Sequence, residues 1–212
     1  MRGFSLVVET PKITSSFAVQ YSEEYKWPLF PLKFEEGKLV GDPAQATTAR
    51  SAIQSWWNGK STCPGLGLPT GQRSGIVILE ADREGVESLR ALEEVRKILE
   101  EADSDQPSTA YQFTPARHMQ VFFRYEGTPL ASGMILRGVR LLAEGEATAL
   151  YPTCFPNGGV YRWRDYDETK IRPLLPLPAC IIRKARPQGR EDIPEAVPGP
   201  NTSGQNENGA NH

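Results

Sequence analysis

The segment between residues 65 and 82 constrains the fold of this chain more than any other. It reads as a short apolar strand, a glycine-rich turn and a fully apolar strand that ends in two acids, Glu80 and Asp82. Side chains two residues apart in a strand point to the same face, so we expect the two carboxylates to lie side by side. Like charges placed this close repel each other unless a cation lies between them. The pair therefore predicts either a site for Mg²⁺ or Mn²⁺, the cations of phosphate chemistry, or two solvated acids at a strand end.

Short motifs follow one another along most of the chain. They are WPLFPL at residues 27–32, ATT at 46–48, IQSWW at 53–57, GLGLPTG at 65–71, SGIVILEAD at 74–82, TPARHMQVFFR at 114–124, a segment that begins at Gly138, and PNGGVYRW at 156–163. In this order and at these spacings, from about Phe17 to Trp163, they resemble the bifunctional DNA primase/polymerase (prim-pol) domain of the archaeo-eukaryotic primase superfamily. The order carries the resemblance, because each motif alone is common.

The resemblance implies an α+β, archaeo-eukaryotic primase-like fold with mixed sheets and flanking helices in two closely packed lobes. It assigns residues 1–185 to one prim-pol-like domain. Residues 186–212 are rich in Pro, Gly, Asn and Glu. Such a segment cannot bury enough apolar surface to offset the entropy lost on ordering, so we expect a disordered C-terminal tail.

The resemblance also implies a function. It indicates a DNA replication protein of a mobile element that carries out template-directed, metal-dependent nucleotidyl transfer. Glu80 and Asp82 would be its catalytic acids and would hold Mg²⁺ or Mn²⁺. Single-stranded DNA and nucleoside triphosphates would be its ligands, and a helicase supplied in trans would be its partner.

Two positions of the expected site depart from the family pattern without losing polarity. Glu80 stands where the family usually has Asp, which moves the carboxylate outward. Gln120 stands where the family has the His that contacts the phosphates of the incoming nucleotide. His118 lies two residues earlier and can substitute only if the backbone register moves.

A third position has lost its acid. Arg140 stands where the family has its third metal-binding Asp. An Arg cannot bind a cation, but it can pair with Glu80 and Asp82 and take over the charge role of the metal. Glu144, four residues later, is the alternative third acid if the strand contains a bulge or a slip in register.

These departures leave a second hypothesis open beside the active enzyme. It is a catalytically degenerate prim-pol fold that binds DNA or nucleotide without catalysis and needs no cofactor. A third hypothesis is a purely structural or partner-binding module.

Phosphate binding is expected at a turn and at a cluster of basic side chains. The turn at residues 70–75 offers small residues and backbone N–H groups. The helix that follows Asp82 directs its N-terminus toward the two acids or any phosphate near them. The nucleotide- or DNA-binding residues that we expect are Arg73, Arg117, His118, Gln120 and Arg124. An ordinary hairpin turn and a solvated basic face are the alternatives.

Composition limits the class of protein further. The net charge of −2 gives no global sign of nucleic-acid binding, so such binding has to come from a local basic surface. Three widely spaced cysteines without a Cys-x-x-Cys motif argue against structural zinc and suit a reducing, cytoplasmic location. The sequence shows neither a signal peptide nor an apolar run of about 18 residues, so we expect no membrane span.

The periodicity of the apolar residues predicts alternating helices and strands. Helices are expected at 16–25, 48–57 and 84–101, and strands at 28–34, 66–68, 76–79, 110–113, 119–124, 134–142, 147–151 and 160–163.

Overall fold

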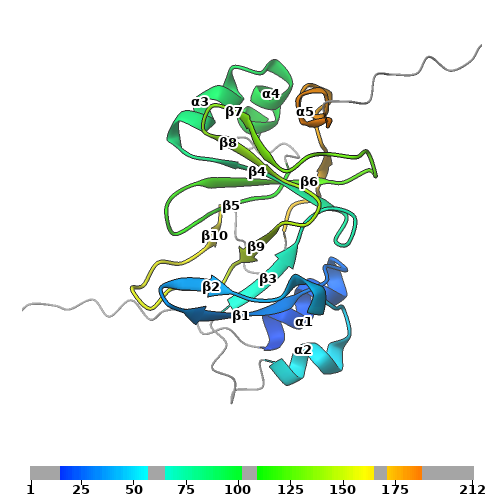
Figure 1. The fold of residues 1–212 in the computed structure, drawn as a ribbon, viewed down its shortest axis with the longest axis vertical. Helices are drawn as coiled ribbons and strands as arrows, with labels where there is room; N and C mark the ends of the chain where they lie inside the picture. Colours follow the sequence, from blue (N-terminus) through cyan, green and yellow to red (C-terminus); the bar gives the residue numbers. More distant parts are fainter. Residues whose placement is uncertain (1–14, 57–64, 102–108, 165–170, 188–212) are drawn as a thin grey trace, which may run out of the picture.

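A computed structural model describes residues 15–56, 65–101, 109–164 and 171–187 of the chain. The described residues form five α-helices, a short 3-10 helix and two mostly antiparallel β-sheets (Figure 1). This mixed architecture agrees with the α+β class expected from the sequence. The division into two lobes stays a prediction. The expected disordered tail lies, from residue 188 on, outside the described residues.

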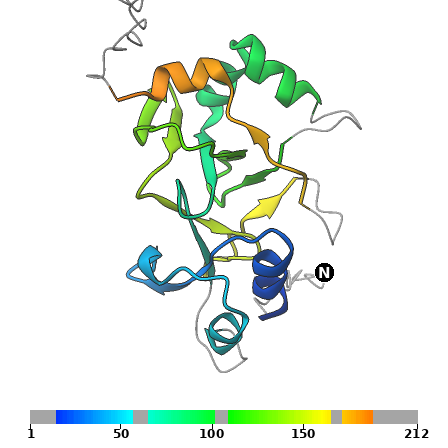
Figure 2. The same cartoon turned by 90° about the vertical axis from the view of Figure 1, so that its right-hand side faces the viewer.

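The smaller sheet has four strands in the order β2-β1-β3-β9. Its strands are β1 (Phe30–Glu35), β2 (Lys38–Val40), β3 (Gly65–Pro69) and β9 (Ala147–Leu150). Helices α1 (Ser15–Glu24) and α2 (Arg50–Trp56) lie beside it, at the lower end of Figure 1 and again at one end in Figure 2. The 3-10 helix η1 (Pro43–Gln45) and strand β2 lie between the strand expected at 28–34 and the helix expected at 48–57, where no helix or strand was predicted.

The larger sheet has seven strands, six of them in the order β10-β5-β6-β4-β8-β7. They are β4 (Ile76–Ala81), β5 (Tyr111–Phe113), β6 (Met119–Arg124), β7 (Gly133–Leu136), β8 (Val139–Leu142) and β10 (Arg162–Trp163). The seventh, β11 (Leu175–Pro176), pairs with β6 in parallel. Helices α3 (Arg83–Arg90), α4 (Glu93–Glu101) and α5 (Ala179–Ala185) lie at the other end of the molecule from α1 and α2 (Figures 1 and 2).

The turn at residues 70–75 carries the chain from one sheet to the other. Strand β3 before it pairs with β1 and β9, whereas β4 after it pairs with β6 and β8. Only a single bridge, between Gly71 and Ile76, closes the turn among the described residues. The turn is therefore a crossing between sheets and not the tight hairpin that local sequence favoured.

Strand β4 lies in the middle of the larger sheet and is buried on both faces. Val77, Leu79 and Ala81 belong to a core that includes residues of α3, α4 and α5. Ile76 and Ile78, on the opposite face, belong to a second core shared with the smaller sheet, α1 and α2. Glu80 follows the same alternation, so its side chain leaves β4 on the face that looks toward the smaller sheet.

Two expected elements are each divided in the structure. The helix predicted at residues 84–101 consists of α3, which ends at Arg90, and α4, which begins at Glu93. Leu89 and Val95 are nevertheless buried in the same core, which explains why the apolar periodicity continues across the break. The strand predicted at 134–142 is a hairpin of β7 and β8, which turns at Gly138 with a φ of 69°. None of the described helices is long and apolar enough to cross a membrane.

Candidate functional site

A row of polar side chains crosses the middle of the larger sheet. Glu80 on β4 is paired in register with Gln120 on β6 and with Arg140 on β8. Gln120 is paired in turn with Gln112 on β5. Residues that oppose each other in an antiparallel pair project from the same face, so all four side chains look toward the smaller sheet.

Hydrogen bonds fix the orientation of the Gln120 amide beside Glu80. Its Oε1 accepts from Gln112 Nε2 at 2.8 Å and from Thr148 Oγ1 at 2.9 Å. Its Nε2 must then face the other way, and it donates to Glu80 Oε2. Gln112 and Gln120 are almost completely buried, so each of these bonds replaces a contact with water that the folded chain has lost.

The same hydrogen-bond chain joins the two sheets. Gln112 Nε2 also donates to the carbonyl of Ala149 on β9 at 2.8 Å, and the backbone N–H of Tyr151 donates to Gln112 Oε1 at 3.3 Å. The carboxylate of Glu80 is thus attached to a network that spans the junction between the sheets.

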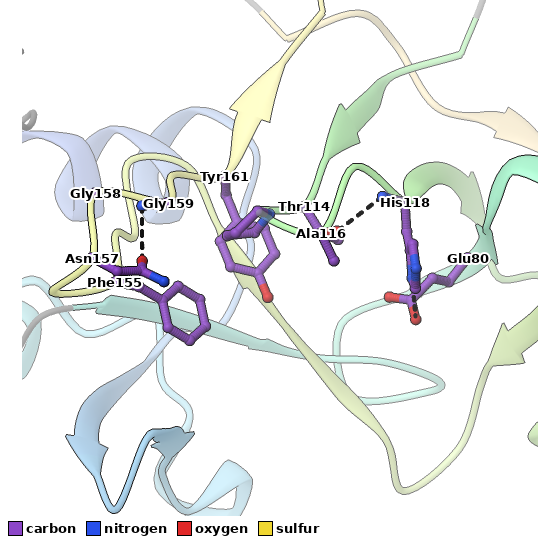
Figure 3. Close-up of a pocket in the computed structure, with 10 residues that line it drawn as sticks. Glu80, Thr114, Ala116, His118, Phe155, Asn157, Gly158, Gly159 and Tyr161 are labelled. Carbon is purple, nitrogen blue, oxygen red and sulfur yellow. Dashed lines mark hydrogen bonds and ion pairs between the residues drawn. The ribbon is translucent and has the colours of Figure 1, made fainter.

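The second oxygen of Glu80 faces an open cleft. His118 Nδ1 lies 3.8 Å from Glu80 Oε1, and the side chain of His118 is 42% exposed against 26% for Glu80 (Figure 3). Burial and, to a smaller extent, the negative charge of Glu80 raise the pKa of the Tyr161 phenol to about 12. Tyr161 therefore keeps its proton above pH 10, where an ordinary tyrosine loses it, and can donate a hydrogen bond.

Two cavities meet at Glu80 and Tyr161. The first, of about 690 Å³, is bounded by the turn between β5 and β6 and by the 155–159 segment, with Phe155 and Asn157 on its wall (Figure 3). The second, of about 460 Å³, lies between β2, β8 and β9 and includes Arg140 and Glu146. Both volumes fall in the range of small-molecule sites.

Asp82 serves the start of helix α3. Its Oδ1 accepts from the backbone N–H of Gly85 at 2.8 Å, which makes it the N-cap residue. A side chain on Gly138 would collide with this oxygen, which shows how closely the turn between β7 and β8 surrounds the carboxylate. The two expected metal ligands therefore have separate hydrogen-bond partners, Gly85 for Asp82 and Gln120 for Glu80.

Arg140 does not make the ion pair expected of it. Its Nη2 lies 2.7 Å from Glu146 Oε1, and within the described part of the chain this is its ion pair, in place of one with Glu80 or Asp82. The reason is that Glu146 lies just before β9 and faces the same cavity. Glu144 does not join the acids either, because its Oε2 accepts from the backbone N–H of Gln72 at 2.8 Å.

The remaining expected binding residues are divided between the site and other places. Arg117 lies in the turn next to His118, with a φ of 64°. Arg73 donates to the carbonyls of Ala44 and Ala46, and so holds the η1 segment instead of facing the cleft. Arg124 pairs with Glu126 at the opposite end of β6 from Met119. The structure thus brings together Glu80, His118 and Gln120, and Arg117 is the exposed neighbour of His118 in the turn.

Sequence reasoning missed three contributors to the site, Gln112, Thr148 and Tyr161. Tyr161 belongs to the 156–163 motif, which was the available signal. Gln112 interrupts the apolar strand between Tyr111 and Phe113, and a polar side chain at that position is the only sign of the buried network.

The side chains do not fit a divalent cation held by three acids. The described residues contain no group of three His, Cys, Asp or Glu side chains that could hold a metal ion. The carboxylate of Glu80 accepts a hydrogen bond from Gln120, and that of Asp82 caps helix α3. The third position holds the cation Arg140, which pairs with Glu146.

Comparison with known proteins identifies a family. A family model described as "Bifunctional DNA primase/polymerase, N-terminal" matches residues 18–180. No curated protein matches the chain. The matched residues include both sheets and the whole site.

Proposed function

Because the chain belongs to the bifunctional DNA primase/polymerase family, we propose that it serves DNA replication by binding single-stranded DNA and nucleotides without catalysing nucleotidyl transfer. The binding site is the cleft beside Glu80. The mobile-element setting, the helicase in trans and the cytoplasmic location stay predictions.

The observation that carries the proposal is what occupies the three positions at which the family has metal-binding acids. Glu80 is held by the buried Gln120, Asp82 caps α3, and Arg140 occupies the third position. Two-metal catalysis needs acids that are free to turn toward the cations. Here one oxygen of Glu80 and one of Asp82 are taken up by hydrogen bonds within the fold, and the third position holds a cation in place of an acid.

The cleft supports binding of a nucleotide or a single strand. The ring of Phe155 is fixed by an edge-on contact with Phe34, whose centroid is 5.5 Å away, and so offers a rigid surface to a base. His118 lines the other wall, and the exposed Arg117 precedes it in the turn, so two basic side chains are offered to phosphates on this side.

A second candidate function is active nucleotidyl transfer with Mg²⁺ or Mn²⁺. It is favoured by the open position of Glu80 Oε1 in the cleft, two residues from Asp82. Magnesium is often held by one or two carboxylates together with substrate phosphates, so the absence of a third acid does not decide the matter. In this case Glu80 and Asp82 are the ligands and Gln120 contacts phosphate.

Assays of primer synthesis and primer extension on single-stranded DNA with Mg²⁺ or Mn²⁺ distinguish binding without catalysis from active nucleotidyl transfer. The proposal expects no product from the wild-type chain. Product that disappears in Glu80→Gln and Asp82→Asn would establish the active enzyme. Asn keeps the helix cap, whereas Asp82→Ala removes it and costs about 1 kcal/mol of unfolding free energy, so the Asn variant separates chemistry from stability.

Binding to single-stranded DNA tests the other half of the proposal. Fluorescence anisotropy should show affinity that falls as salt rises, because phosphate contacts release counterions. Arg117→Asn, which tolerates the left-handed backbone, should lower the slope of log K against log salt by about 0.7. Arg90→Gln on α3 is the control and should leave the slope unchanged. Absent or salt-independent binding would leave only a structural or partner-binding role.

A further inference from the structure

One corner of the larger sheet exposes an aromatic ring on the face turned away from the cleft. Tyr111 and Phe113 lie two residues apart on β5 and project from the same face, whereas Gln112 between them looks toward the smaller sheet. Tyr111 is buried in the core that α3, α4 and α5 cover, but Phe113 is 38% exposed. In both views these helices lie at the upper end of the molecule and β10 lies below them (Figures 1 and 2). A single exposed ring is ordinary, so its neighbours decide what it can do.

Two guanidinium groups lie on the same face as this ring. Arg162 on β10 is paired in register with Phe113, so the two side chains leave neighbouring strands side by side. Arg162 is exposed, and among the residues that the structure describes it has no ion-pair partner. Arg164 lies over the ring of Tyr111, with its Cζ 5.4 Å from the ring centroid, and donates to the Tyr111 hydroxyl. Tyr111, Phe113, Arg162 and Arg164 thus form one surface of aromatic and basic side chains, the β5–β10 surface.

The β5–β10 surface begins where the cleft ends. The turn from Thr114 to His118 joins β5 to β6 and forms one wall of the larger cavity. Phe113 immediately precedes this turn and projects from the other side of the sheet. The exposed Arg117 lies within the turn. A single strand that leaves the cleft over this turn therefore meets Arg117 and then the open face of Phe113.

We propose that the β5–β10 surface binds the continuation of the single-stranded DNA held in the cleft, with a base stacked on Phe113 and a phosphate paired with Arg162. This inference rests on the proposed function and extends its binding site to the other face of the sheet. Base stacking on an aromatic ring is independent of sequence, because every base has a π-face. The planar guanidinium of an arginine suits the oxygens of a phosphate.

The ring of Phe113 is held in place before any ligand arrives. It contacts Tyr111 edge-on, with the ring centroids 5.9 Å apart and the planes at 81°. Tyr111 is in turn held by the guanidinium of Arg164 and by the core. A side chain that is already ordered loses little conformational entropy on binding, so more of the stacking energy remains as affinity.

The small apolar area of this surface favours a nucleic acid over a protein partner. Exposed large apolar side chains among the described residues are Val40, Phe113 and Met134. Val40 lies on β2 of the smaller sheet, and Met134 lies on β7 at the opposite edge from β10, so Phe113 has neither beside it. A stable protein interface buries about 800 Å² on each partner. One ring is too little for that, but it is sufficient for one base.

The test measures affinity for single-stranded DNA of two lengths by fluorescence anisotropy. Oligothymidylates of about 4 and about 12 nucleotides are used, because single-strand-binding domains occupy about 4 to 16 nucleotides. Phe113→Ser should weaken binding of the longer oligonucleotide about tenfold and leave the shorter one, which fits within the cleft, unchanged. Phe113→Tyr keeps the aromatic face and should bind both as the wild type does. Met134→Ser is the matched control, because it removes a more exposed apolar side chain, 66% exposed, at the other edge of the same sheet.

Salt dependence tests the phosphate contact of Arg162. Arg162→Gln should lower the slope of log K against log salt by about 0.7 for the longer oligonucleotide and leave the slope for the shorter one unchanged. Arg162→Lys keeps the charge and should keep the slope. Because Arg162 is exposed, these variants remain informative even if Phe113→Ser does not fold.

The outcomes separate this inference from the proposed function. Wild-type affinity of Phe113→Ser and Arg162→Gln for the longer oligonucleotide would refute this inference alone and would leave the exposed ring to a protein partner. A loss in these variants, with no effect of Arg117→Asn, would establish the β5–β10 surface and refute binding in the cleft. A wild-type chain that binds neither oligonucleotide would refute both.

Discussion

Single residues around Glu80 decide what the site can do. Its spacing from Asp82 at the end of an apolar strand singled out Glu80, and the resemblance to the family's motifs singled out Gln120 and Arg140. Neither could supply their partners, because these come from distant segments. Thr148 reaches Gln120 across 28 residues, and Ala149 reaches Gln112 across 37. A polar residue in an apolar strand shows that a partner is needed, and only the assembled sheets show which partner it has.

The raised pKa of Tyr161 predicts how the stability of the folded chain depends on pH. The pKa of its phenol rises from 10.0 to about 12, so above pH 10 the folded chain keeps a proton that the unfolded chain loses. This contribution to stability is complete below pH 10 and is lost as the pH rises through about 12. The unfolding free energy should therefore fall with pH in this window, by at most about 1.4 kcal/mol per pH unit from this group.

Urea denaturation of the wild type and of Tyr161→Phe between about pH 9 and pH 12 measures this contribution. The variant should show a shallower decline, because it has no phenol to titrate. Parallel curves for the two proteins would mean that the phenol is not held in its neutral form by the fold.

Elements were predicted well where one period continued and poorly where the chain turned within a pattern. Strand β6 was predicted with its observed bounds, because Met119, Val121, Phe122 and Phe123 make it apolar on both faces apart from Gln120. The break between α3 and α4 was missed, because Leu89 and Val95 face the same core on either side of it. The β7–β8 turn was missed because its only local sign is Gly138, whose positive φ appears in the structure. In both cases the position at which the chain turns is set by packing in the folded structure and not by the local sequence pattern.

The close approach of α3 to the β7–β8 turn predicts an inverted effect of alanine. Alanine usually stabilises a helix by about 1 kcal/mol relative to glycine. At Gly85 the added Cβ would collide with the carbonyl oxygen of Gly138. Gly85→Ala should therefore lower the unfolding free energy, by about 2 kcal/mol.

Chemical denaturation followed by circular dichroism measures the effect. Glu87→Ala on the exposed side of α3 is the control, and its change should stay within about 0.5 kcal/mol. A Gly85→Ala protein as stable as the wild type would show that α3 can move away from the turn without loss.

The whole molecule depends on the layer between its two sheets. The α+β class was predictable because helical and alternating patterns succeed each other along the chain. The assignment of β3 and β4 to different sheets was not, because two apolar strands joined by a short glycine-rich turn read as a hairpin. In the structure an aromatic cluster fills the junction. Phe122 stacks on Trp27 at 6.1 Å and contacts Trp163 at 4.9 Å between ring centroids.

This layer predicts that both sheets unfold together. Phe122→Leu should lower the unfolding free energy by about 2 kcal/mol, since the smaller side chain leaves a cavity between the sheets. Tryptophan fluorescence reports on all four tryptophans, of which Trp27 and Trp163 lie at the junction. Far-UV circular dichroism reports on the helices and strands as a whole. The two transitions should coincide in the wild type and should shift by the same amount in the variant. Separate transitions would show that the sheets are independent units.

The crossing at residues 70–75 has a consequence for the chain as it is being made. Strand β4 is apolar on both faces, yet its partners β6 and β8 follow it by some forty residues or more in the sequence. During synthesis it leaves the ribosome before either partner exists. Residues 76–81, the centre of the larger sheet, are thus an exposed apolar segment of the nascent chain. They are the segment to which a ribosome-associated chaperone would bind.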